Sequence, residues 1–145
     1  MGFPDRIERR VELAHPPATV WAALTTPDGL SAWFGDRATI DLRPGGAAQM
    51  TFRSGLTVDM RIERVDEPAV FAFTWRLPDL PADDPRRTYV EFTLEAVRGG
   101  EGTRLHVVET GFAQLPDDAR RQAYDSHADG WASELADRAR YLDAV

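Results

Sequence analysis

The 145-residue chain contains no cysteine and no lysine, and all 17 of its basic residues are arginine. The absence of cysteine excludes disulfides, thiol nucleophiles, iron–sulfur clusters and thiolate zinc sites. The absence of lysine excludes Schiff-base chemistry and a lysine general base. No apolar run approaches the length of about 18 residues that a membrane span needs, and the amino terminus lacks a signal-peptide pattern. We therefore expect a cytoplasmic protein without membrane insertion.

The charge balance is acidic, with 24 Asp and Glu residues and a formal net charge of −7. Nucleic acids and anionic membranes bind clustered positive charge, so neither is expected as a main partner. Hydrophobic residues make up 43% of the chain, which is enough for a folded core. The length is that of one ordinary domain, so we expect a single domain over residues 1–145.

Alternation of apolar and polar residues predicts strands over much of the chain. The first strand lies within residues 5–15, and helical spacing predicts two short helices at 17–25 and 28–34. Six further strands are expected between residues 37 and 109, the first of them reaching Leu42 and the last two joined by a turn at 99–102. Residues 116–142 change to the spacing of a long amphipathic helix. Together these elements indicate an α+β fold with an antiparallel sheet of about seven strands.

Short motifs along nearly the whole chain resemble one family. The segment PATVWAALT at 17–25 resembles the first helix of the SRPBCC superfamily, which has the START-like or Bet v 1-like helix-grip fold. The segments WFG at 33–35, RPGG at 43–46, EP at 67–68, FTW at 73–75 and GW at 130–131 are similar to small bacterial homologues of the activator of heat-shock protein 90 ATPase. The resemblance implies a curved sheet wrapped around the long C-terminal helix, with a cavity between them. Members of the superfamily bind lipids or other hydrophobic molecules, cyclise polyketides or act as co-chaperones, so the fold implies no single activity.

Glu109 is the first candidate for chemistry. Alternation places it on the strand face of Leu105 and Val107, which is expected to face the long helix. An enclosed carboxyl group has a raised pKa, which suits a general base or polar recognition of a ligand. In the other interpretation the strand ends near residue 109, where Thr110 and Gly111 let the side chain reach water. The sequence leaves both interpretations open.

His127 is the second candidate and lies on the inner stripe of the predicted long helix, between Tyr124 and Trp131. Facing a cavity, it would pair with Glu109, hold a polar group of a ligand or move a proton. The alternative is a core histidine bonded to a backbone carbonyl or to water. His106 is expected to point outward, and the three histidines lack metal-ligand spacing, so neither a metal nor a cofactor is expected.

An aromatic set marks the expected interior, together with two methionines able to adapt to differently shaped ligands. The aromatic residues and the two methionines are Trp33, Met50, Met60, Phe71, Phe73, Trp75, Tyr124 and Trp131. Such side chains line ligand pockets, and they equally fill cores. The long loop at 78–87 is either a functional lid or a plain surface excursion.

A large apolar interior with only one or two polar groups favours binding over catalysis. We therefore predict that the protein binds a small hydrophobic or amphipathic molecule between the sheet and the long helix. One alternative is a cyclase, dehydratase or hydrolase that uses Glu109 and His127 as its acid–base pair. Another is a co-chaperone-like or other protein-binding module, with a homodimer as a further possibility.

Overall fold

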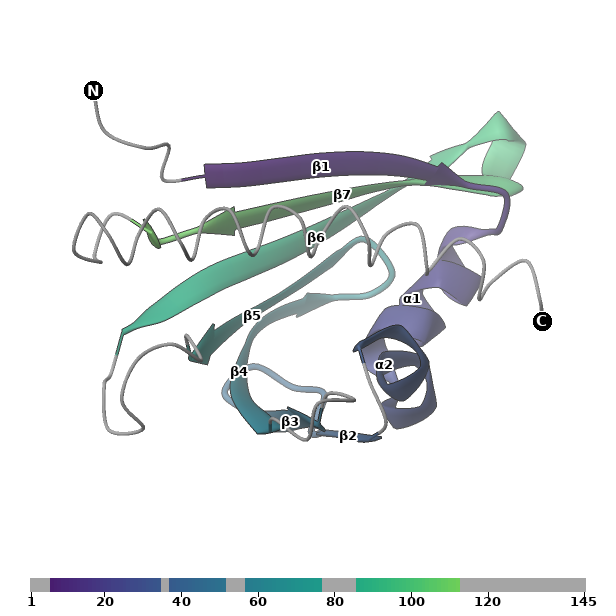
Figure 1. Ribbon diagram of the computed structural model, residues 1–145. Helices are drawn as coiled ribbons and strands as arrows, with labels where there is room; N and C mark the ends of the chain where they lie inside the picture. Colours follow the sequence, from purple (N-terminus) through teal and green to yellow (C-terminus); the bar gives the residue numbers. More distant parts are fainter. Residues whose placement is uncertain (1–5, 35–36, 52–56, 77–85, 113–145) are drawn as a thin grey trace, which may run out of the picture.

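The computed structural model describes residues 6–34, 37–51, 57–76 and 86–112 of the chain. Figure 1 shows how the elements of this part are arranged. In chain order they are β1 (Arg6–Leu13), α1 (Pro17–Thr25), α2 (Pro27–Phe34), β2 (Arg37–Ile40), β3 (Ala47–Thr51), β4 (Thr57–Asp66), β5 (Val70–Arg76), β6 (Arg87–Val97), the 3₁₀ helix η1 (Arg98–Gly100) and β7 (Gly102–Thr110). The predicted order of one strand, two short helices and six strands is confirmed.

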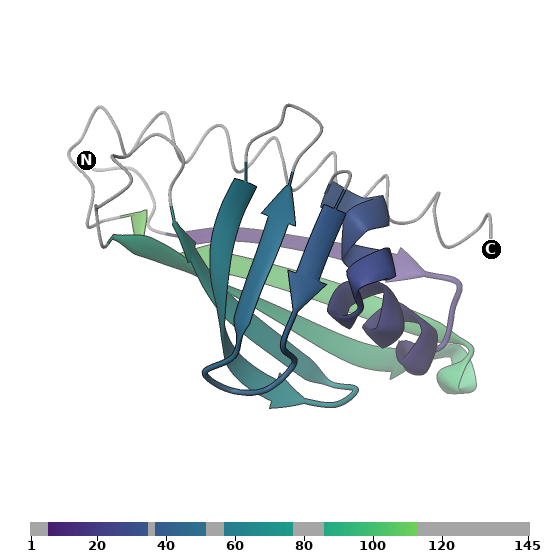
Figure 2. The ribbon, with the colours of Figure 1, turned by 90° about the horizontal axis from the view of Figure 1, so that it is seen from below.

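The strands form one seven-stranded antiparallel sheet in the order β1-β7-β6-β5-β4-β3-β2. β1 is one edge strand of the sheet and pairs with β7. Every other pair of neighbouring strands is consecutive in the chain. The sheet is strongly curved, so that β2 and β3 run across the direction of β1 and β7 (Figures 1 and 2). A register shift between Ile62 and Arg64 marks a bulge in β4, and a bulged strand bends. The predicted curved antiparallel sheet of seven strands is therefore confirmed.

Alternation explains which face of each strand is buried. Every second side chain of β6 and β7 lies in the interior, at positions Thr88, Val90, Phe92, Leu94, Thr103, Leu105, Val107 and Glu109. The intervening side chains form the outer face of the sheet. None of the helices that the structure describes has the length and apolar character of a membrane span.

Local hydrogen bonds support both ends of α1. The carbonyl oxygen of Pro16 accepts hydrogen bonds from the amides of Thr19 and Val20, at 3.0 and 3.2 Å. A second proline occupies the first helical turn, where its missing amide costs nothing because that amide would lack an intrahelical partner. Near the other end, the Thr25 hydroxyl donates to the carbonyl oxygen of Trp21 at 2.8 Å. The helix predicted at 17–25 is confirmed, and the Trp21 side chain is buried.

One boundary prediction is wrong. β2 ends at Ile40, and Leu42 is 36% exposed. The Arg43 amide already donates to the carbonyl oxygen of Asp41, and the Gly46 amide donates to that of Arg43, so the backbone turns where the alternating pattern continues. The predicted helix at 116–142 and residues 78–85 of the predicted loop lie outside the described residues.

Candidate functional site

Glu109 is fully buried on the inner face of β7, with 0% of its surface exposed. Its neighbours across the sheet are apolar, because it lies opposite Ile7 of β1 and Val90 of β6. β7 continues through Glu109 and ends at Thr110. The prediction that Glu109 faces inward is confirmed, and the alternative in which its side chain reaches water is wrong.

Trp75, Thr88 and Glu109 form a triangle of hydrogen-bonded side chains, called the buried triad below. Trp75 Nε1 donates to Glu109 Oε2 at 2.9 Å, and the Thr88 hydroxyl donates to the same oxygen at 2.5 Å. Trp75 Nε1 also lies 2.9 Å from Thr88 Oγ1. Each member comes from a different strand, and Trp75 and Thr88 are register partners across β5 and β6. The pairing of three adjacent strands therefore assembles this polar cluster.

Trp75 and Thr88 oppose the cost of burying the carboxylate. An ionised carboxylate in an apolar interior loses its hydration, which costs several kcal/mol even after the protein relaxes. Hydrogen bonds to a charged group contribute about 1.5–3 kcal/mol each, so Trp75 and Thr88 offset part of that cost. A carboxylate can accept about four hydrogen bonds. Chemically, such a group can accept a hydrogen bond from a ligand, pair with a cation or take up a proton.

A row of aromatic rings runs from the buried triad to α1 and is called the aromatic row below. The ring centroids lie 5.2 Å apart for Trp75 and Phe73, 5.6 Å for Phe73 and Phe71, and 6.2 Å for Phe71 and Trp21. Phe92 of β6 stacks on Phe71, with its ring plane tilted by 11° and its centroid 6.4 Å away. Each such pair contributes about 0.5–1.5 kcal/mol beyond the area that it buries. The row is thus a continuous apolar wall that ends at a carboxylate.

The remaining residues predicted for the ligand site divide into two groups. Those with described side chains are all buried: Met50, Met60, Phe71, Phe73 and Trp75. Met60 is the register partner of Trp75 across β4 and β5, which places it beside the triad end of the row. Those without described side chains are Trp33, which lies in α2, and Tyr124, His127 and Trp131. A contact between Glu109 and His127 therefore stays a prediction.

Sequence reasoning misses two residues of this region, Thr88 and Trp21. Thr88 is a polar residue on the same alternating face as Val90 and Phe92, and that inward position is the signal that identifies it. Its bond to Glu109 depends on strand pairing, which alternation within one strand does not give. Trp21 belongs to the motif at 17–25, but helical spacing alone assigns it to the core.

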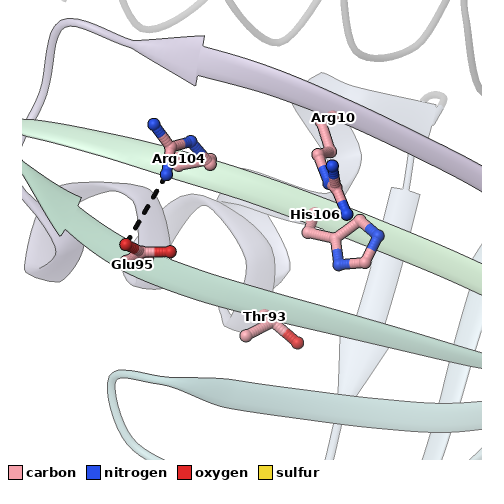
Figure 3. Close-up of a pocket in the computed structure, with 5 residues that line it drawn as sticks. All are labelled: Arg10, Thr93, Glu95, Arg104 and His106. Carbon is pink, nitrogen blue, oxygen red and sulfur yellow. Dashed lines mark ion pairs between the residues drawn. The ribbon is translucent and has the colours of Figure 1, made fainter.

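The outer face of the sheet carries a shallow pocket of about 330 Å³ (Figure 3). Its lining residues come from β1, β6 and β7 and are Arg10, Thr93, Glu95, Arg104 and His106. Arg104 lies 3.5 Å from Glu95, and His106 lies 3.0 Å from Glu8. The Arg6 side chain hydrogen-bonds to Glu8, and His106 lies beside the same carboxyl; both hold the pKa of Glu8 below its usual value. His106 faces outward as predicted, and the arginine side chains of the pocket lie near carboxylates.

Metal coordination requires several convergent ligands. No group of three or more His, Cys, Asp or Glu side chains suited to hold a metal ion occurs within the part of the chain that the structure describes.

Comparisons with solved structures show the same fold. Protein MLL2253 from Mesorhizobium loti is 26% identical, with a TM-score of 0.81 over 97% of this chain and 98% of that chain. The Aha1 dimer from Colwellia psychrerythraea is 21% identical, with a TM-score of 0.73 over 94% and 95%. PFC0360w, an HSP90 activator from Plasmodium falciparum, is 21% identical, with a TM-score of 0.63 over 74% of each chain. The last two likenesses show the fold alone.

Sequence comparisons identify the family. A search of curated proteins gives no match. Residues 14–143 match the family described as Activator of Hsp90 ATPase homolog 1-like protein, which confirms the resemblance seen in the short motifs. Because this match spans most of the 145 residues, the chain belongs to the Activator of Hsp90 ATPase homolog 1-like family.

Proposed function

We propose that the protein binds a small hydrophobic or amphipathic molecule on the inner face of its curved sheet. In this proposal residues 1–145 form one helix-grip domain, and the predicted helix at 116–142 covers the molecule from the other side. The observation that carries the proposal is the buried triad: a carboxylate with no exposed surface stands at the end of an apolar wall.

A filled core gives no reason for such a carboxylate. Replacing buried ionic groups by well-packed apolar residues is often neutral or stabilising, so stability alone does not favour Glu109. A ligand site combines apolar contact area with a few placed polar groups. The aromatic row supplies the area, and Glu109 supplies an oriented acceptor. The group that it would select is a hydroxyl, an amide N–H or an amine.

The test compares decylamine with decanol, which share an apolar chain and differ in charge. Glu109→Gln keeps the shape of the side chain and removes its negative charge. Isothermal titration is expected to show decylamine binding weakened roughly tenfold or more, with decanol binding changed much less, because hydrogen bonds to charged groups contribute about 1.5–3 kcal/mol. Glu95→Gln, on the exposed outer face of β6, is the matched control and should leave both affinities unchanged.

Two outcomes contradict the proposal: neither compound binds the unmodified protein, or Glu109→Gln leaves decylamine binding unchanged. Native mass spectrometry of freshly purified protein provides an independent check, because a retained small molecule adds a defined mass. Loss of this molecule in Glu109→Gln, but not in Glu95→Gln, would support binding on the inner face of the sheet.

The acid–base alternative depends on a second proton-transfer group. Among the residues that the structure describes, Glu109 is the one buried ionisable side chain, and in this alternative His127 is the second group. Glu109→Gln should then abolish turnover of a carbonyl substrate while the protein stays folded. An unaffected rate would reject this role.

A protein-binding module is the second candidate function, and the family description and the fold of the HSP90 activator from Plasmodium falciparum favour it. Its test is titration of the purified chain into an Hsp90-class chaperone, with ATP hydrolysis as the readout. Stimulated hydrolysis would support it, and the absence of both binding and stimulation would reject it. Sedimentation of the free chain separately tests a homodimer, the state in which the relative from Colwellia psychrerythraea was solved.

A further inference from the structure

Two buried tryptophans stand at opposite ends of the aromatic row, and their indole N–H groups differ. Trp75 Nε1 donates within the buried triad. Trp21 is only 4% exposed, and its Nε1 is buried without a hydrogen-bond partner among the residues that the structure describes. The same chemical group is therefore satisfied at one end of the row and unsatisfied at the other.

The contacts that the structure describes for Trp21 do not involve its N–H. The Thr25 hydroxyl bonds to the Trp21 carbonyl oxygen in α1. The Phe71 ring meets the indole nearly edge-to-face, with the two planes 74° apart. Phenylalanine would fill much of this space without burying a donor. An unsatisfied buried donor loses the hydrogen bonds that it made to water, so its presence calls for an acceptor.

A buried water explains this donor poorly. Buried waters typically make about three hydrogen bonds and need two to four polar partners. The other buried side chains of α1 are apolar apart from Thr25, and the Thr25 hydroxyl already donates to the backbone. An acceptor that belongs to a larger molecule needs no such partners, because apolar contacts hold the rest of that molecule.

We propose that the Trp21 N–H is the second polar contact of the ligand site and donates to a carbonyl or ester oxygen of the bound molecule. This inference rests on the proposed function and specifies its ligand class. Glu109 receives the hydroxyl or amine end, and Trp21 the acceptor end. Phe71 and Trp75 are four residues apart on β5, so their Cα atoms are about 13 Å apart at about 3.3 Å per residue, and Trp21 packs against Phe71. The ligand is thus an elongated molecule, apolar in the middle, with a donor at one end and an acceptor at the other.

The test uses two probes: the methyl ester of a medium-chain ω-amino acid, and the n-alkylamine of the same chain length. They share the amine and the apolar chain and differ in the ester carbonyl. Isothermal titration of the intact chain should show the ester bound roughly three- to tenfold more tightly, as expected for one neutral hydrogen bond. Trp21→Phe, which keeps a ring beside Phe71, should make the two affinities equal. Glu95→Gln should preserve the difference.

A second readout uses the unmodified protein and does not depend on the folding of a variant. In proton–nitrogen correlation spectra, the Trp21 indole signal should move downfield when the amino ester binds and stay in place with the alkylamine. Equal affinities for the two probes, or an indole signal that the ester leaves unmoved, would overturn the inference while alkylamine binding at Glu109 still upheld the proposed function. Binding of neither probe would overturn both.

Discussion

Thr88→Val deletes one hydroxyl from the buried triad and keeps the branched shape of the side chain. That hydroxyl donates to Glu109 Oε2 at 2.5 Å and lies 2.9 Å from Trp75 Nε1. A hydrogen bond to a charged acceptor contributes about 1.5–3 kcal/mol. The free energy of unfolding should therefore fall by about that amount, and the Tm by roughly 3–10 °C for a chain of this size.

Thr103 provides a matched control on the neighbouring strand. Like Thr88 it has no exposed surface, and its hydroxyl donates to the backbone carbonyl of His15 at 2.8 Å. A hydrogen bond between neutral groups contributes about 0.5–1.5 kcal/mol, so Thr103→Val should cost less. Both variants replace one buried hydroxyl by a methyl group, and the difference between them therefore reports the charge of the acceptor.

Urea unfolding followed by tryptophan fluorescence measures both losses, provided that the m-values stay equal. Thr88→Ser, which retains the hydroxyl, should recover most of the stability lost in Thr88→Val. If Thr88→Val costs no more than Thr103→Val, then Glu109 does not act as a charged acceptor. That result would refute the electrostatic reasoning behind the buried triad.

Trp75→Phe removes the indole donor to the carboxylate and should also lower the free energy of unfolding, measured in urea, by about 1.5–3 kcal/mol; no loss would mean that this bond contributes nothing. Gly29→Ala would place a Cβ atom 2.4 Å from the carbonyl oxygen of Ala23, so α1 and α2 must separate. Thermal unfolding should show a loss of about 1–3 kcal/mol, and an unchanged Tm would contradict the close approach. Burial, with the hydrogen bond to Glu91, raises the pKa of Tyr89 from 10.0 to about 12. The unfolded chain then ionises this tyrosine first, so stability should fall as the pH rises from about 10 towards 12. An ultraviolet titration that subtracts Tyr89→Phe checks the value, and a Tyr89 phenolate already formed near pH 10 in the folded protein would contradict it.

The sheet is predictable from sequence because each strand buries one face, and burial selects every second residue. In β6, for example, Val90 and Phe92 are buried while Glu91 between them is partly exposed. The boundary at Leu42 is not predictable in this way. Alternation records which side chains are apolar, whereas the end of a strand depends on where backbone hydrogen bonds leave the ladder.

The candidate site is predictable only in part, for a related reason. The inward position of Glu109 follows from the residues beside it in the chain. Its partners Thr88 and Trp75 are 21 and 34 residues away in sequence. Their contacts depend on the register of three strands, which is a property of the whole sheet. Likewise, the unsatisfied N–H of Trp21 is a property of its surroundings, and helical spacing shows only that the residue is buried.

Charge interactions differ in strength between the exposed outer face and the buried inner face of the sheet. On the outer face, the Arg104–Glu12 pair has side chains 42% and 54% exposed, and such surface pairs contribute about 0–1 kcal/mol and weaken with salt. Among the residues that the structure describes, Glu109 is the one carboxylate that water does not reach. Its interaction with a donor or a cation is screened far less than those of the outer face. The net charge of −7 therefore says little about a ligand, whereas in the proposed function Glu109, at the end of the aromatic row, selects one.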